Sequence, residues 1–331
     1  MFVDHHLAVL DQTTHWFLLE NKLLTVVEIL EEFLATNKEP SGDSSIIPTT
    51  LVSTVARQKV TVALSADGGD EVFAGYPKYI KGVKYFSMLN KIPQPLARLA
   101  AGLMQIFQPA TRSDYSIPDR YEKMKLVLQK REPVYAFNVV TEVFTFLETQ
   151  RIMLPPMKYL NTPFDENSFL NSHNDLLSRF QATEFKTYLV DDILQKVDRA
   201  TMSVSLEGRE PFLDQRIIEF VAKLPSEFKL KNGVGKILLR EMVHKYIPEK
   251  MMNRPKMGFM VPVALWFRNE LKEFLQFYLD KERIAKQGIF KPEEIDRMVQ
   301  SYFSQNKNGD FNRIWFLLMF QMWFRKYGAT M

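Results

Sequence analysis

The chain has 331 residues, of which 46% are hydrophobic and 25% charged, a composition typical of globular proteins with a substantial core. It contains no cysteine, which excludes disulfides, thiolate metal sites and a cysteine nucleophile within this sequence. The formal net charge of +4, without a dense Lys/Arg tract, argues against a nucleic-acid partner and is compatible with a bound polyanion.

The beginning of the sequence lacks a basic region followed by an apolar one, so we expect no secretory signal and a cytoplasmic protein. The most apolar run, residues 314–324, is much shorter than the ~20 residues that cross a bilayer. It predicts a buried C-terminal helix, and we expect no membrane partner.

The first 90 residues show strand and helix patterns in alternation. The run HLAVLD, residues 6–11, predicts a short strand, and apolar residues at helical spacing predict a helix over residues 23–35. A cap-rich turn then leads into a second helix within residues 39–58. The β-branched run at residues 60–66 predicts a buried strand, followed by a glycine-rich turn and a helix near Glu71. This order favours an α/β fold with a parallel sheet.

The remainder is mainly helical. Turn-rich linkers are predicted at residues 108–119 and 155–175, and the chain is mostly helical from about Gln181. The clearest helical patterns cover residues 95–107, 121–130 and 134–147. With its strands clustered at the N-terminus, the sheet is thinner than α/β sheets normally are.

The sequence SADGGDE, residues 65–71, directly follows the predicted strand. Ligands of parallel sheets gather at the carboxyl ends of the strands. Gly68 and Gly69 allow a tight turn, and backbone amides before a helix can hold phosphate. Asp67 and Asp70 would repel a bare phosphate but suit Mg²⁺ between acid and phosphate. A plain strand-to-helix turn in which Asp70 caps the helix is the alternative, and the motif alone leaves both open.

A second group of charges lies in DDILQKVDRATMSVSLEGREPFLD, residues 191–214. Glu207 and Arg209 adjoin apolar residues, and charges beside a core are normally paired. We therefore expect a buried salt-bridge network at Glu207 and Arg209. Asp191 and Asp192 are the stronger candidates for direct contact with a ligand.

Lysines in the last third of the chain provide candidate positive charges. Gly233 and Gly235 predict a turn before Lys236 at a helix start, and Lys256 lies in a short basic turn. A lysine can neutralise a phosphate or a developing anion, although a solvated surface lysine is the alternative. None of the five histidines has metal-ligand spacing, and neither a P-loop nor G-x-G-x-x-G nor G-x-S-x-G is present.

Four blocks resemble, in the same order, the synthetase domain of glutamine-hydrolysing asparagine synthetases. LSADGGDEVFAGYPKY resembles the family's LSGDGGDELFGGYxRY, and KEPSGDSSIIPTTLVS its DEPFxDSSxIPTYLVS. The charged block above resembles DDxLxKxDRxSMxxSLExRxPFLD, and KILLREMVHKYIPEKMMNRPKMGFMVP resembles KxxLRxxxxxxLPxxIxxRxKxGFxxP. The agreement extends over roughly residues 5–270.

The resemblance implies a fold and a domain organisation. Residues 1–90 would form a partial nucleotide-binding α/β core with a truncated parallel sheet, similar to the adenine nucleotide alpha hydrolases. Residues 91–331 would form the mainly helical part of the same synthetase domain, in which residues 191–214 and 233–262 contribute to the site.

The resemblance also implies a reaction. ATP and an aspartate side-chain carboxylate would react with Mg²⁺ to give an acyl-adenylate and pyrophosphate. Ammonia drawn from glutamine would then give asparagine and AMP. Asp67 would assist proton removal from ammonia, Tyr76 would shape the site and Lys256 would stabilise charge on the phosphate or intermediate. Asp70 would bind Mg²⁺ and pyrophosphate. The remaining implied contacts are Ser65, Gly68, Gly69 and Lys236 to the nucleotide, and Asp191, Asp192, Ser44 and Ser45 to the substrate.

Several positions depart from the family pattern. Ala66 and Ala74 replace glycines and Lys38 replaces an acid. A relative that amidates another carboxylate, or a β-lactam-forming synthetase, is therefore an alternative. Residue 2 is Phe instead of the glutaminase cysteine, and the S-G-G-x-D-S-S pyrophosphate loop is missing.

From these absences we expect an incomplete synthetase, a fragment or one half of a split enzyme. It would work with an upstream polypeptide or as a homo-oligomer, take ammonia from a glutaminase domain outside this chain, and show little activity alone. A non-catalytic remnant that binds a partner is the alternative from another functional class.

Overall fold

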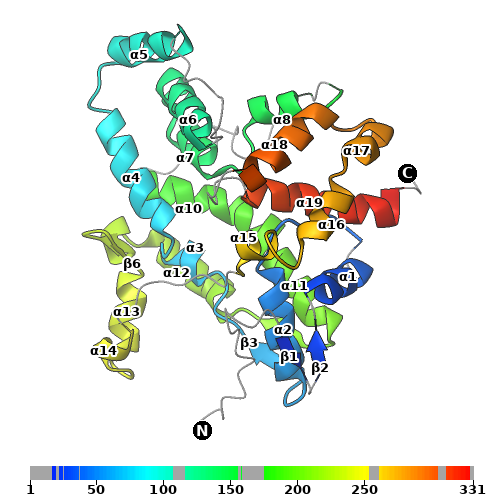
Figure 1. The fold of residues 1–331 in the computed structure, drawn as a ribbon. Coiled ribbons are helices and arrows are strands. Elements are labelled where there is room, and N and C mark those ends of the chain that lie inside the picture. Colours follow the sequence, from blue (N-terminus) through cyan, green and yellow to red (C-terminus); the bar gives the residue numbers. More distant parts are fainter. Residues whose placement is uncertain are drawn as a thin grey trace.

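The computed structural model describes residues 17–19, 22–24, 26–36, 38–106, 116–155, 158, 175–252, 261–304 and 311–328. These residues are mostly helical and include three two-stranded sheets (Figure 1). Within them, no helix has both the length and the apolar character needed to span a membrane.

The described residues before 142 contain the whole β1–β2 pair, one strand of the β3–β4 pair and seven helices. These elements are β1 (Phe17–Leu19), β2 (Lys22–Leu24), α1 (Val26–Thr36), α2 (Ile46–Arg57), β3 (Val62–Leu64), α3 (Gly69–Val72), α4 (Pro77–Leu89), α5 (Gln94–Ile106), α6 (Ser116–Lys130) and α7 (Pro133–Thr141).

The elements described beyond residue 142 are helices apart from three very short strands. These helices and strands are α8 (Phe146–Ile152), α10 (Leu176–Lys186), α11 (Gln195–Ser203), β4 (Glu207–Arg209), α12 (Gln215–Lys223), β5 (Leu230–Lys231), β6 (Val234–Gly235), α13 (Ile237–Val243), α14 (Glu249–Met252), α15 (Val263–Trp266), α16 (Lys272–Tyr278), α17 (Lys281–Gln287), α18 (Pro292–Ser304) and α19 (Phe311–Tyr327). A π-helical segment, Leu189–Leu194, joins α10 to α11, and two 3₁₀ turns lie at Pro211–Leu213 and Ser226–Phe228.

Helices α1, α2, α5 and α6 confirm the predicted patterns within a few residues, but the helix predicted over residues 134–147 is two helices. The break is caused by a capping box, because the Thr145 hydroxyl accepts from the Glu148 N–H (3.3 Å) and the Glu148 carboxylate accepts from the Thr145 N–H (2.9 Å). The start of α6 lies inside the predicted linker at 108–119. The predicted strand at residues 6–11 and most of the linker at 155–175 lie outside the described residues.

The sheet at the candidate site differs from the prediction. β3 pairs in parallel with β4, which places Val62 opposite Glu207 and Leu64 opposite Arg209. Among the described residues, the partner strand thus comes from the charged middle segment. The predicted burial of β3 is wrong, since Leu64 is 75% exposed. Among the described residues, β4 is the only strand that pairs with β3, so much of the strand stays uncovered.

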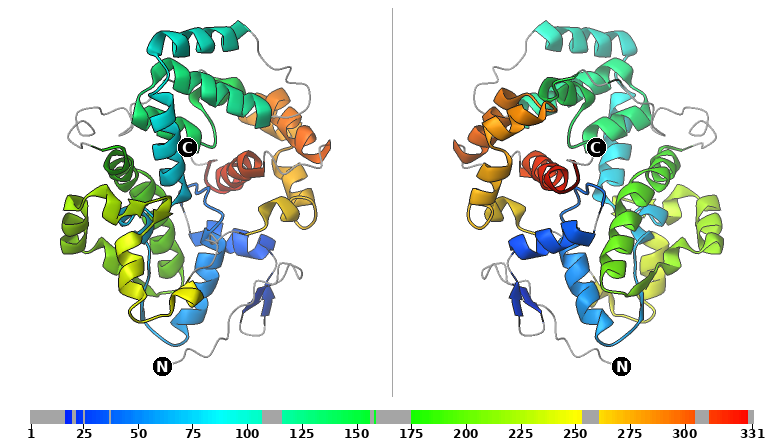
Figure 2. Two further views of the ribbon diagram at one scale, coloured as in Figure 1. Left: turned by 90° about the vertical axis from the view of Figure 1, so that its left-hand side faces the viewer. Right: turned by 90° about the vertical axis from the view of Figure 1, so that its right-hand side faces the viewer.

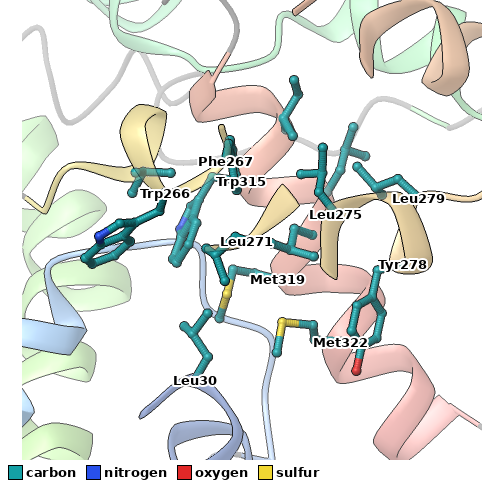
Figure 3. Packing of buried hydrophobic residues seen from close by; sticks show 14 of the residues in the cluster. Leu30, Trp266, Phe267, Leu271, Leu275, Tyr278, Leu279, Trp315, Met319 and Met322 are labelled. Atoms are coloured by element: carbon teal, nitrogen blue, oxygen red, sulfur yellow. The ribbon is translucent and has the colours of Figure 1, made fainter. Parts of the chain in front are cut away.

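The main hydrophobic core lies between the C-terminal helices and the N-terminal helices α1 and α2 (Figure 3). The prediction of a buried C-terminal helix is confirmed, because α19 is flanked by α15, α16 and α18 and buries Trp315, Leu318 and Met322. Figure 1 shows α19, in red, extending from the centre of the molecule to its edge beside the C-terminus.

Helices α4 to α7 form an arm that projects from this body (Figures 1 and 2). α5 packs on α6 and α6 on α7. α5 lies at the outer end of the arm in every view.

Candidate active site

The turn after β3 is built by residues that the sequence singled out. The Ser65 N–H donates to the Arg209 carbonyl (2.8 Å), which continues the parallel ladder. The Ser65 hydroxyl donates to Asp67 Oδ2, and the Asp67 N–H donates to Ser65 Oγ (3.1 Å). Gly68 has a φ of +81°, and a Cβ there would strike the Leu213 side chain, so the turn requires glycine. Ser65 and Asp67 are thereby held at the carboxyl end of the strand.

Asp70 lies in α3 and does not cap it. The N-cap position is Gly68, which makes no side-chain cap. Asp70 Oδ1 instead lies 3.1 Å from Lys236 Nζ, and both side chains are about a quarter exposed, at 23% and 29%. The alternative of a turn capped by Asp70 is therefore wrong.

Two glycines let the α3 loop and the α13 loop approach each other. A Cβ at Gly75 would collide with the Asp70 carboxylate, and a Cβ at Gly235 would collide with the Ala74 carbonyl. The Lys236 N–H donates to the Phe73 carbonyl (3.0 Å), which fixes the start of α13. The residues predicted to contact the nucleotide are thus in one place: Ser65, Gly68, Gly69, Asp70 and Lys236.

A second polar cluster forms where the loop before α2 meets α11. The Ser45 hydroxyl donates to Asp43 Oδ2 (2.7 Å), and the Ser45 N–H donates to Asp43 Oδ1 (2.8 Å). The buried Lys196 ammonium lies 3.1 Å from Asp43 Oδ2 and donates to Ser45 Oγ (3.0 Å). Asp43, Ser45 and Lys196 therefore combine both signs of charge in a partly buried place.

Asp192 faces this cluster from the π-helical segment. Burial raises the pKa of Asp192 to about 6, the Asp43 charge adds to the rise, and Lys196 and Lys78 oppose it. π-Helical turns often occur at functional sites because they change the direction of the following side chains. Among the described residues, the Asp191 carboxylate and the Ser44 hydroxyl make no hydrogen bond or ion pair. The structure thus brings Ser45 and Asp192 together and leaves Ser44 and Asp191 outside the cluster.

Lys78 links the two clusters. Its ammonium pairs with the buried Glu184 and lies over the rings of Tyr76 (4.7 Å) and Tyr188 (4.0 Å). The Tyr76 hydroxyl donates to the buried Glu71 (2.8 Å). Burial, followed by the Glu71 charge, raises the pKa of Tyr76, so that this phenol stays protonated. Sequence reasoning missed Lys78, for which the only signal is its place directly after GYP in the first block.

Burial also raises the pKa values of two carboxylic acids in this network. The pKa of Glu71 rises despite its hydrogen bond from Tyr76, and the pKa of Glu184 rises despite its pairing with Lys78. Both side chains are almost completely buried. The network is therefore held in place by hydrogen bonds and ring contacts in a poorly solvated interior.

A further acid, Glu210, faces Asp67 across the ends of the two parallel strands. Burial raises the pKa of Glu210, and the charges of Asp67 and Asp198 add to the rise.

The prediction of a buried salt-bridge network at Glu207 and Arg209 is wrong. These residues form a 2.7 Å ion pair, but they lie two residues apart on β4 and are 53% and 63% exposed. Glu210, which the sequence analysis did not single out, is the acid of this block that turns toward the turn after β3.

The acidic side chains near the turn after β3 decide whether the predicted Mg²⁺ could be held there. Within the described part of the chain, no three His, Asp or Glu side chains are grouped as a metal cage. Mg²⁺ is commonly held by one or two carboxylates together with substrate phosphates and water. Asp70, beside the turn that carries Asp67, fits that mode of binding.

Two further observations limit the site. The predicted catalytic Lys256 lies outside the described residues. A pocket of about 540 Å³ lies beside α3, α10 and α12, and its lining includes Glu71, Gln181 and Lys229. Its lining includes none of the site residues predicted from the sequence, but it borders the candidate site at Glu71, the acceptor of the Tyr76 hydroxyl.

Comparison with known proteins places the four sequence blocks within one family match. The asparagine synthase family matches residues 12–325. Asparagine synthetase (glutamine-hydrolyzing) 1 from Bacillus subtilis (strain 168) is 29% identical over 289 residues, which are 86% of this chain and 43% of that relative. A relative from Mycobacterium bovis that also carries an asparagine synthetase name is 27% identical over 301 residues, 90% of this chain and 44% of the relative.

The human asparagine synthetase is 32% identical over 123 residues, 35% of this chain and 21% of that relative. The chain thus spans less than half the length of the first two relatives, at 43% and 44%. Because the family match covers nearly the whole sequence, this chain belongs to the asparagine synthase family.

Proposed function

We propose that this chain is the synthetase part of an ATP-dependent amidotransferase that converts aspartate to asparagine, AMP and pyrophosphate. The observation that supports this most directly is the 3.1 Å approach of Lys236 to Asp70 at the carboxyl end of β3. It places a cation and an acid at the edge of the sheet where nucleotides bind in α/β proteins.

In the adenylation step, an oxygen of the aspartate side-chain carboxylate attacks the α-phosphorus of ATP. The bond to the bridging oxygen of the β-phosphate breaks, and pyrophosphate leaves with the electron pair. Ser65 and the turn at Gly68 and Gly69 would contact the nucleotide, and Lys236 would neutralise the leaving pyrophosphate. Bound Mg²⁺, with Asp70 as its ligand, would supply further positive charge there.

The second cluster offers groups that are complementary to aspartate itself. The carboxylates of Asp43 and Asp192 suit the substrate ammonium, whereas Lys196 and Ser45 suit a substrate carboxylate. This assignment keeps Ser45 and Asp192 as substrate contacts and adds Asp43 and Lys196. Tyr76 and Lys78 would connect the two clusters and shape the space between them.

In the amidation step, ammonia attacks the acyl carbon and the bond to the AMP oxygen breaks. The nitrogen loses a proton, for which the Asp67 carboxylate is the proposed acceptor. The Ser65 hydroxyl donates to Asp67 and would hold it in place. Lys256 would stabilise the negative charge of the intermediate.

The β3–β4 pair supports the proposal that this chain works with an upstream polypeptide. A parallel sheet is normally covered on both faces, yet Leu64 is 75% exposed and Val62 37% exposed. We assign the cover of this exposed face, together with further strands beside β3 and a phosphate-binding loop, to the polypeptide that also supplies ammonia.

Aspartate-dependent exchange of labelled pyrophosphate into ATP tests this proposal, because it reports adenylation without ammonia. We expect little exchange with this chain alone and clear exchange after the upstream polypeptide is added. In the combined enzyme, Asp70→Asn should lower exchange by at least ~100-fold, as for other lost transition-state contacts. Glu219→Gln is the matched control: it also removes one negative charge, but at an exposed residue of α12, and it should leave the exchange rate unchanged.

Three results would contradict parts of the proposal. Robust exchange by this chain alone would exclude a need for the upstream polypeptide. Full exchange in Asp70→Asn would refute the metal role of Asp70. Exchange that another carboxylate supports better than aspartate would favour the alternative of a related amidotransferase or a β-lactam-forming synthetase.

A further inference from the structure

Helix α5 is packed against the protein through its smallest side chains. Ala97 and Ala101 are each 1% exposed and lie against Leu128 of α6. A helix of a globular protein normally turns its large aliphatic residues toward the core and its polar residues toward water. In α5 the side toward the protein is formed mainly by alanine.

The opposite face of α5 carries large aliphatic side chains. With 3.6 residues per turn, Leu96, Leu99, Leu103 and Ile106 form one stripe on the side away from Ala97 and Ala101. Leu96, Leu99, Leu103 and Ile106 are 56%, 60%, 48% and 73% exposed. Single exposed leucines are common in monomers, whereas four on one face of one helix mark a contact surface.

The position of this stripe makes it accessible to a flat surface. α5 forms the outer end of the arm, and Figures 1 and 2 show no other element beyond it. Since α6 lies on its inner side, the aliphatic stripe points away from the molecule. A partner with a flat surface can therefore contact the aliphatic stripe without a groove that encloses the helix.

The stretch of sequence that contains α5 carries charges of one sign, whereas the acids nearest to it in space, such as Glu122, belong to α6 on its inner side. From residue 72 to residue 113 the sequence has no Asp or Glu. Among the described residues of this stretch, the exposed cations are Lys81, Lys84, Lys91 and Arg98, of which Arg98 belongs to α5 itself. An apolar helical face in a stretch whose charged side chains are all basic complements the surface of a bilayer that contains anionic lipids.

We infer that α5 is an interfacial helix that docks this chain on an anionic membrane surface. The aliphatic stripe would enter the boundary between headgroups and acyl chains, and the lysines and Arg98 would contact lipid phosphates. This inference replaces the expectation of no membrane partner, which rested on the lack of a spanning segment. It concerns location and is independent of the proposed reaction.

Vesicle binding tests the inference directly. The chain should sediment with phosphatidylcholine vesicles containing about a third phosphatidylglycerol, less with phosphatidylcholine alone, and less at high salt. The triple variant Leu96→Gln, Leu99→Gln and Leu103→Gln should bind at least ~10-fold more weakly. Its melting temperature should match the parent, because the replaced side chains face solvent. Phe220→Gln in α12, at a residue 59% exposed, is the matched control and should bind normally.

The absence of cysteine permits a site-specific probe of the same contact. An environment-sensitive fluorophore on Ile106→Cys should shift to the blue when anionic vesicles are added, whereas the same label on Phe220→Cys should not. No sedimentation of the parent chain, or equal binding by the triple variant, would overturn the inference. The inference would also be overturned if the parent chain forms a dimer that does not bind vesicles and the triple substitution dissociates that dimer. The stripe would then be a self-association surface.

Discussion

The C-terminal helices α15 to α19 and the segments around the candidate site are packed differently. The C-terminal helices form one continuous core with α1, α2 and α8 that includes Trp266, Phe267 and Leu275 (Figure 3). Around the site and in the arm of α4 to α7, buried apolar residues occur in separate clusters of three to five. Between those clusters lie buried ionisable groups such as Glu71 and Glu184. The comparison indicates that one region provides stability, whereas the other retains polar groups at a cost in stability.

The two regions meet at the loop that precedes α2. The Trp315 indole donates to the Gly42 carbonyl (3.0 Å), and the Trp323 indole donates to the Lys38 carbonyl (2.7 Å). A Cβ at Gly42 would contact the Phe316 ring, so the loop lies directly on α19. This loop continues into Asp43, which binds Lys196. The C-terminal helices, in which the sequence showed no chemistry, therefore position one side of the candidate site.

The largest effect is expected from a cavity in the continuous core. Leu275 is completely buried, so Leu275→Ala should lower the free energy of unfolding by about 4 kcal/mol, within the range for buried leucines. Leu230→Ala, at a partly buried residue beside a small site cluster, should cost less. Urea unfolding measures both. Equal losses would mean that the site region is packed as tightly as the core.

A nearly as large effect is expected from the buried charges of the site. Lys78→Met removes the cation that pairs with Glu184 and should lower the free energy of unfolding by about 3 kcal/mol at neutral pH. The double variant with Glu184→Gln should recover much of that loss, because it no longer buries an unpaired acid. A double-mutant cycle based on urea unfolding reports the coupling. Additive losses would show that the two side chains do not interact.

Asp192 should make the stability depend on pH. Its pKa of about 6 in the folded chain exceeds the ordinary value of 3.8, so the folded state binds more protons between these pH values. The free energy of unfolding should therefore fall as the pH rises from about 4 to 6. The stabilisation is complete below the unfolded pKa and is lost above the folded one. Glu71 and Glu184, whose pKa values are also raised, contribute with the same sign.

Asp192→Asn separates this contribution from the others. Removing the buried carboxylate should raise the free energy of unfolding at pH 7 by up to about 3 kcal/mol, since its pKa rises from 3.8 to about 6 and one pKa unit corresponds to ~1.4 kcal/mol. It should also flatten the pH profile of urea unfolding, while aspartate-dependent exchange in the combined enzyme falls. Such a trade-off between stability and activity is common at binding sites. A variant less stable than the parent at pH 7 would contradict the assigned cause.

The sequence predicted the parts of this fold that depend on local patterns. The helical periods predicted α1, α2, α5 and α19, and the glycines of SADGGDE predicted the turn that Gly68 makes. The partner of β3 was missed because β4 has only three residues, and its charged sequence, Glu207–Arg209, lacks the pattern of a buried strand. Strand pairing between distant segments depends on tertiary contacts that local patterns do not contain.

The same limit applies to the site. Ser65, Asp70 and Lys236 were recognised by motif, but their grouping required close approach of two loops, which Gly75 and Gly235 permit. Asp43 and Lys78 were missed because single charged residues in loops or at helix starts carry little signal in one sequence. Asp191 and Asp192 look equivalent as neighbouring acids, but Asp192 lies four residues before Lys196, a helical spacing that brings these two side chains together and that the motif alone does not reveal.

The smallest effect concerns Ala74, one of the departures from the family's glycines. Ala74 has a φ of +56° in the loop that meets Gly235, a conformation that costs a non-glycine residue about 1 kcal/mol. Ala74→Gly should remove this strain, at the expense of a buried methyl group and greater unfolded-chain entropy. We expect a net gain of about 0.5 kcal/mol in the free energy of unfolding. Ala97→Gly, at a buried residue in the regular helix α5, should instead lose about 1 kcal/mol. A gain in the free energy of unfolding for Ala74→Gly and a loss for Ala97→Gly, both measured by urea unfolding, would support the left-handed backbone at Ala74. A loss for both variants would exclude it.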